Sequence, residues 1–81
     1  MLEVQLSGAF RDALDGAASV QIEAATIREL LRKLKERYPR LHDPIEAGVA
    51  VSINGNIFRD NWGEPIPPGA EVFLLPRIPG G

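Results

Sequence analysis

The sequence has 81 residues, a formal net charge of −2, 44% hydrophobic and 25% charged residues. This length and composition indicate one small folded domain with no room for a large substrate cavity. Cysteine is absent and histidine occurs once, which excludes disulfides, thiolate nucleophiles, cysteine-ligated zinc and iron–sulfur clusters. No apolar run approaches the roughly 20 residues that cross a bilayer, and the N-terminus lacks a signal-peptide pattern. We therefore expect a cytoplasmic protein that binds neither membrane nor, given its acidic balance, nucleic acid.

Two segments near the N-terminus alternate apolar and polar residues. Residues 2–6 show this alternation, and it returns in 19–23. A period of two is typical of half-buried strands, and the two segments are close enough in the chain to pair as an antiparallel ribbon. Residues 9–14, between them, fit about one turn of helix.

A longer helix is predicted between Thr26 and Pro39. Thr26 and Glu29 have the spacing of a capping box, in which the threonine oxygen accepts from a free backbone N–H group and the glutamate reaches back. Pro39 ends the helix, because the residue before a proline is pushed out of the helical region. The apolar positions form one stripe at helical spacing: Ile27, Leu30, Leu31, Leu34 and Tyr38.

The same stretch is rich in basic residues: Arg28, Arg32, Lys33, Lys35, Arg37 and Arg40. Glu29 precedes Lys33 by four positions, the favourable orientation for an ion pair on a helix. Glu36 precedes Arg40 in the same way. No aromatic residues that could stack on bases interleave with these cations, so we interpret the stretch as a solvated helix face.

Few other side chains suit catalysis or metal binding. His42 and the neighbouring Asp43 make neither a catalytic triad nor a complete metal site, so we expect a surface histidine and no metal. Trp62 is expected to anchor the loop before Pro65. No glycine-rich motif that could cradle phosphates is present.

The C-terminal half returns to strand patterns. Residues 41–48 fit a short turn of helix or a loop, and 49–54 alternate again. Asn54-Gly55 favours a tight hairpin, from which Ile57 and Phe58 begin the return strand. Residues 70–75 are apolar on both faces, which is typical of a strand inside a sheet.

The order strand, strand, helix, strand, short strand, strand indicates an α+β fold. A helix crossing over a mixed sheet of four to five strands gives the β-grasp, or ubiquitin-like, architecture. We expect one such domain over residues 1–76, packed on one main helix, followed by a flexible, extended tail over 77–81.

The tail reads Pro76-Arg77-Ile78-Pro79-Gly80-Gly81. Its two prolines cannot donate to a strand ladder, and the residues after Pro76 can reach roughly 17 Å when extended. The two glycines lack a Cβ and can thread a passage too narrow for other residues. The α-carboxylate of Gly81, with an ordinary pKa near 3.5, becomes reactive only after activation.

Phe73 and Leu75 are predicted on the sheet face opposite the helix, beside the root of the tail. The other residues expected on that face are mostly polar or small: Glu3, Gln5, Gln21, Ala50 and Ser52. An exposed apolar cluster often marks a docking site for a partner. The alternative is that Phe58, Trp62 or a loop folds over the two side chains.

Several motifs together resemble the MoaD/ThiS sulfur carriers, ubiquitin-like proteins that end in Gly-Gly. The resemblance covers the whole chain. It is carried by these segments: Gly8-Ala9-Phe10-Arg11-Asp12-Ala13-Leu14-Asp15-Gly16, the Thr26 helix ending in Tyr38-Pro39, Val51-Ser52-Ile53-Asn54-Gly55, Pro68-Gly69-Ala70-Glu71-Val72-Phe73-Leu74-Leu75-Pro76 and Gly80-Gly81. The spacing from Pro76 to the end is most similar to the molybdopterin synthase small subunit. Arg77, Pro79 and Asp12 depart from the usual pattern of that subunit.

The resemblance implies a carrier rather than an enzyme, with no permanently bound cofactor. A ubiquitin-activating-like adenylyltransferase would use ATP to adenylate Gly81, with Gly80 giving access. A sulfurtransferase or cysteine desulfurase would then supply sulfur, and the thiocarboxylate would serve the large subunit of molybdopterin synthase in molybdenum cofactor biosynthesis. The residues implied in partner binding are Phe73, Leu75, Pro76, Arg77, Ile78 and Pro79.

Other functions fit the same residues. The client pathway could instead be thiamine, cysteine or tRNA thiolation. Gly81 could also be joined to lysines of target proteins, as in a ubiquitin-like modifier. A third hypothesis is a binding module with an inert tail.

Overall fold

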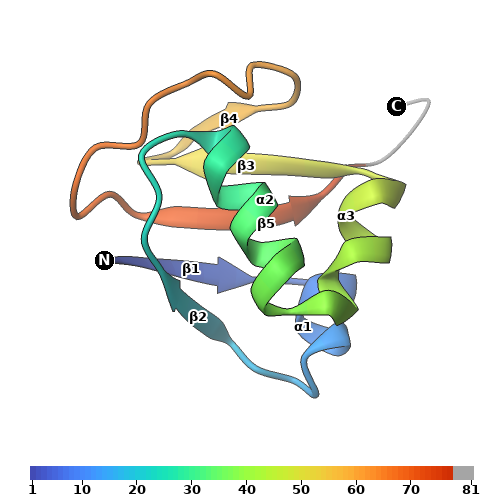
Figure 1. Ribbon diagram of the computed structural model, residues 1–81. Coiled ribbons are helices and arrows are strands. Elements are labelled where there is room, and N and C mark those ends of the chain that lie inside the picture. The colour runs from blue at the N-terminus through green and yellow to red at the C-terminus, as the bar shows by residue number, and fades with distance from the viewer. Residues whose placement is uncertain (78–81) are drawn as a thin grey trace.

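A five-stranded mixed sheet with helices on one face forms the structure, a computed structural model that describes residues 1–77 (Figure 1). The strand order is β2-β1-β5-β3-β4. The elements, in chain order, are β1 (Leu2–Leu6), α1 (Ala9–Ala13), β2 (Ser19–Ile22), α2 (Ile27–Arg37), the 3-10 turn η1 (Pro39–Leu41), α3 (His42–Ala47), β3 (Val49–Ile53), β4 (Asn56–Phe58) and β5 (Val72–Pro76). This arrangement confirms the predicted β-grasp fold.

The last strand occupies the centre of the sheet. β5 runs parallel to β1 and antiparallel to β3, so it has a hydrogen-bonded neighbour on each side. The prediction of an internal strand is therefore confirmed. The strand begins later than expected, because the Ala70 N–H group donates to Pro67 O in a turn and the ladder starts only at Val72.

The main helix begins as the capping residues predict. Thr26 Oγ1 accepts from the Glu29 N–H group at 3.2 Å, while the Glu29 carboxylate accepts from the Ala25 N–H group at 2.7 Å. α2 crosses one face of the sheet, and α1 and α3 lie beside its C-terminal half (Figure 1). Its apolar stripe is buried at Ile27, Leu30, Leu31 and Leu34. The fully buried side chains at the centre of the core are Phe10, Ile27, Leu30, Leu34, Leu41, Leu74, Val4, Val51 and Val72.

One of the two predicted ion pairs on the helix is wrong. Lys33 Nζ lies 3.8 Å from Glu29 Oε1, as expected. Glu36 instead pairs with Arg32 at 3.2 Å, and Arg40 makes two hydrogen bonds to Asp15. The i,i+4 rule fails for Glu36 and Arg40 because the helix ends at Arg37, which places Arg40 in the following 3-10 turn.

The predicted hairpin joins β3 and β4. Asn54 and Gly55 have φ values of +51° and +88°, as a tight turn of this kind requires. The Asn54 side-chain oxygen also accepts from the Glu71 N–H group at 3.0 Å, and the Asn54 N–H group donates to Glu71 O at 2.9 Å. The turn is thereby fastened to the chain entering β5. Within residues 1–77, no helix has the length and apolar character to span a membrane.

Candidate functional site

The root of the predicted tail is fastened to the domain by backbone contacts. β5 ends with Pro76 opposite Val49, and the Arg77 N–H group donates to Gly48 O at 3.3 Å. One residue pair upstream, Ser7 Oγ donates to Leu74 O at 3.0 Å. The chain therefore leaves the sheet at a fixed place, between the end of α3 and the end of β1.

Two glycines allow this close passage. Gly8 has φ +56°, and a Cβ built on it would lie 3.2 Å from Pro76 Cγ. Gly48 has φ +146°, and a Cβ there would lie 3.4 Å from Arg77 Cβ and Arg77 O. Both positions combine a backbone conformation that side chains rarely adopt with a near neighbour in the tail root, which explains glycine at each.

The Arg77 side chain is also held. Its guanidinium lies 3.1 Å from Asp60 Oδ1, with side-chain exposures of 44% for Arg77 and 82% for Asp60. An exposed ion pair contributes at most about 1 kcal/mol, but this one ties the tail root to the loop after β4. Ile78, Pro79, Gly80 and Gly81, the remaining tail residues singled out by the sequence, lie outside the described residues.

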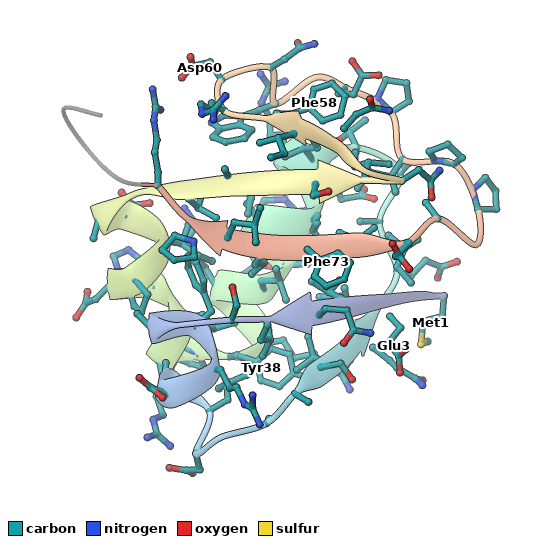
Figure 2. All side chains as sticks on the ribbon, turned by 180° about the vertical axis from the view of Figure 1, so that it is seen from behind. Met1, Glu3, Tyr38, Phe58, Asp60 and Phe73 are labelled. Carbon is teal, nitrogen blue, oxygen red and sulfur yellow. The ribbon has the colours of Figure 1, made fainter. Side chains whose placement is uncertain are left out.

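Phe73 and Leu75 lie on the open face of the sheet, away from the helices (Figure 2). Both side chains are half-buried, while Val72 and Leu74 of the same strand are fully buried against the helices. The prediction placed them correctly on this face, and their partial burial comes from their neighbours in the sheet.

Two of those neighbours are more buried than their place on an open face suggests. Ala50 is paired with Leu75, and Ser52 with Phe73, and only 4% of Ala50 and 7% of Ser52 is accessible. Their side chains are short, so the larger side chains beside them shield them. Ile57 lies opposite Ser52 on β4 and is 49% exposed.

Ile57 was missed by the sequence reasoning. The signal was present, because a hairpin at Asn54-Gly55 sets Ile57 across from Ser52 and hence on the same face. We refer to Phe73, Leu75 and Ile57, with Ala50 and Ser52 between them, as the open-face patch.

The alternative that Phe58 or Trp62 covers Phe73 and Leu75 is wrong. Phe58 is paired with the buried Val51 and therefore points to the helix side of the sheet. The carbonyl of Trp62 accepts from the Arg28 N–H group at 2.8 Å, which places that loop against the start of α2. Both residues pack on the core from the helix side.

The remaining candidates have the positions of surface residues. His42 Nδ1 lies 3.2 Å from Asp43 Oδ1, and both side chains are exposed. The part of the chain that the structure describes holds no cluster of three or more metal-ligating side chains. Away from the tail root, the hydrogen bond from Lys35 lowers the pKa of Glu46, and the one from Arg40 lowers the pKa of Asp15.

Comparison with known proteins decides the family. The ThiS family model matches residues 4–81, nearly the whole chain. The chain belongs to the ThiS family of ubiquitin-like sulfur carriers. No curated protein sequence matches this ThiS-family chain.

Solved structures show the same fold. Molybdopterin converting factor subunit 1 from Pyrococcus furiosus is 24% identical with a TM-score of 0.76, over 95% of this chain and 97% of that one. SAMP1, a small archaeal modifier protein, from Haloferax volcanii is 23% identical with a TM-score of 0.74, over 99% and 98%. A chain of the Amycolatopsis orientalis BexX/CysO complex is 21% identical with a TM-score of 0.72, over the full length of both.

Proposed function

We propose that this chain is a sulfur carrier whose reactive group is the C-terminal carboxylate of Gly81. The observation that carries the proposal is the ThiS family match extending through the terminal Gly80-Gly81. A cytoplasmic partner enzyme adenylates Gly81 with ATP, and a hydrosulfide equivalent from a sulfur donor then displaces AMP. The product is a thiocarboxylate, in which one carboxylate oxygen has been replaced by sulfur.

The architecture supports a division of labour between carrier and partners. A carboxylate is a poor electrophile until it is activated, and adenylation supplies the leaving group. The chain has no cysteine that could attack its own activated terminus. The domain holds the tail root, and the partner enzymes supply the catalytic groups and bind the ATP.

Partners need a surface by which to recognise the carrier, and the open-face patch is suited to this. It is apolar, lies on the uncovered side of the sheet and continues along β5 to Pro76 and Arg77. We propose that the adenylating enzyme docks on Phe73 and Leu75 and takes up the tail from Pro76 onward. The same surface would then meet the enzyme that accepts the sulfur.

For the client we propose a molybdopterin synthase, whose large subunit would receive the tail in its active site. The spacing from Pro76 to Gly81 supports this choice, as does the fold shared with molybdopterin converting factor subunit 1 from Pyrococcus furiosus. Other sulfur-accepting enzymes are distinguished by which large subunit forms a complex with the thiocarboxylated carrier.

Intact-mass spectrometry tests the central step. The full chain is incubated with its adenylating enzyme, ATP and a sulfur donor, and we expect the mass change of one oxygen replaced by sulfur. The variant lacking Gly81 should stay unmodified. A full chain that stays unmodified with its cognate enzyme, or a Gly81 deletion that retains full sulfur transfer, would overturn the proposal.

A second function is supported by the fold shared with SAMP1, a modifier protein. The same adenylate could acylate a lysine of a target protein and form an isopeptide bond. Immunoblots of cells that express the tagged chain distinguish this function from sulfur transfer alone. High-mass conjugates that disappear when Gly81 is deleted would support it, and their absence would leave the carrier role.

A further inference from the structure

A groove on the helix side of the molecule adjoins the tail root. It has a volume of about 260 Å³ and lies between α2, α3 and the loop that carries Trp62. Leu31, Ile45 and Val49 form its apolar floor, and Arg28, Arg32 and Lys35 contribute its basic side. We call this surface the helix-side groove.

The groove and the tail are linked through neighbouring residues. Val49 directly follows Gly48, whose carbonyl accepts the Arg77 N–H group. The Trp62 N–H group donates to the carbonyl of Asp60, whose carboxylate pairs with Arg77. A protein that receives the tail therefore also meets the mouth of this groove, on the side of the sheet opposite the open-face patch.

The charge of the groove differs from that of the whole chain. The chain has a formal net charge of −2, but the groove wall holds three cations against one carboxylate, that of Glu46. Glu46 already pairs with Lys35 at 3.0 Å, and Arg32 pairs with Glu36 at 3.2 Å. Among residues 1–77 the guanidinium of Arg28 makes no ion pair, and its side chain is exposed.

We propose that the helix-side groove docks an acidic segment carrying an apolar side chain, contributed by the enzyme that adenylates the tail. The inference rests on the proposed function. The apolar side chain would contact the floor and Trp62, while the acidic groups would face Arg28 and Arg32. Complementary charge of this kind steers the encounter and fixes the orientation of the partner, so the carrier is gripped on both sides of the tail root.

Trp62 provides a direct readout, because it is the only tryptophan in the chain. The probe is an acetylated peptide that alternates glutamate with leucine, titrated at low salt while the tryptophan emission is recorded. We expect saturable binding that weakens as salt rises. A peptide that alternates lysine with leucine should bind more weakly, and a single-stranded oligonucleotide should not compete.

Matched charge removals test the location. Arg28→Gln with Arg32→Gln removes two groove cations, whereas Arg11→Gln with Arg37→Gln removes two exposed cations that do not line the groove. We expect the groove pair to weaken peptide binding by roughly three- to tenfold, as two partly exposed ion pairs allow, and the control pair by much less. Urea midpoints of both variants should stay close to the parent value, because all four side chains are exposed.

The adenylating enzyme separates this inference from the proposed function. In ATP–pyrophosphate exchange, the groove pair should raise the KM for the carrier by a similar factor and leave kcat unchanged. A parent chain that is not adenylated at all overturns the proposed function. A parent chain that is adenylated, with the same KM for the groove and control variants, overturns the groove inference alone, as does tighter binding of the oligonucleotide than of the acidic peptide.

Discussion

Replacing Gly8 by alanine tests whether the tail root is held by close backbone passage. Gly8 has φ +56° and ψ −131°, a conformation that strongly favours glycine, and an added Cβ would lie 3.2 Å from Pro76 Cγ. Forcing a residue with a Cβ into such a conformation costs roughly 1–3 kcal/mol. For a domain of this size, that loss lowers Tm by roughly 5–20 °C.

Two other glycines separate the contributions. Gly55→Ala also has a positive φ, +88°, but a Cβ there meets no atom within 4 Å, so it incurs the conformational cost alone. Gly63→Ala has neither a near neighbour nor a positive φ and should change stability by less than about 0.5 kcal/mol. We therefore expect the order of destabilisation Gly8, then Gly55, then Gly63, measured by urea unfolding followed through Trp62 fluorescence.

A second measurement connects the loss of stability to the tail. If the new methyl group displaces Pro76, the bond from the Arg77 N–H group to Gly48 O should weaken, and hydrogen exchange at Arg77 should become faster than in Gly55→Ala. Equal stability for Gly8→Ala and Gly63→Ala would refute the reasoning. So would unchanged exchange at Arg77 in a destabilised Gly8→Ala protein.

Three further outcomes follow from the structure. Phe73→Glu should weaken binding to the adenylating enzyme while circular dichroism stays native, because the side chain lies on the open face; unfolding of the variant would show that Phe73 belongs to the core. Thr26→Ala should cost about 1 kcal/mol in urea unfolding through loss of the bond to the Glu29 N–H group, and Thr26→Ser should recover most of it. Asp15→Asn should remove a contribution to stability that exists above the ordinary aspartate pKa of about 4 and is lost as pH falls through the lowered pKa of the folded state. The difference in urea midpoint between parent and Asp15→Asn should therefore shrink on acidification, and a difference that is the same at pH 3 and pH 7 would contradict the role of the Arg40 contact.

The fold could be predicted because its determinants are local. Alternation in 2–6 and 49–54 fixed which side chains face the helices, and Asn54-Gly55 fixed the register of the hairpin. Thr26 and Pro39 marked the ends of the main helix to within about a residue. Each of these signals acts through the backbone conformation of a few consecutive residues, which is the range over which a sequence pattern can be read directly.

The parts of the site that could not be predicted depend on residues far apart in the chain. Asp60 and Arg77 are 17 positions apart, and their ion pair exists because the loop after β4 returns to the end of β5. The helix-side groove likewise combines α2, α3 and the loop of Trp62. The Glu36–Arg40 prediction failed for a related reason, because a helical rule was applied beyond the residue where the helix ends.

The position of β5 separates the requirements of folding from those of recognition. Val72 and Leu74 point into the core between the sheet and the helices, so the fold constrains both residues to be apolar and closely packed. Phe73 and Leu75, on the other face of the same strand, can change with little effect on that core. The tail root is meanwhile held by main-chain groups of Gly48 and Arg77, whose positions do not depend on the side chains that a partner reads. A carrier built in this way can change partners through its open-face patch and helix-side groove while the point at which its tail leaves the domain stays fixed. We therefore expect the client pathway to be decided by those two surfaces and by the side chains of the tail, and the β-grasp core to be interchangeable between clients.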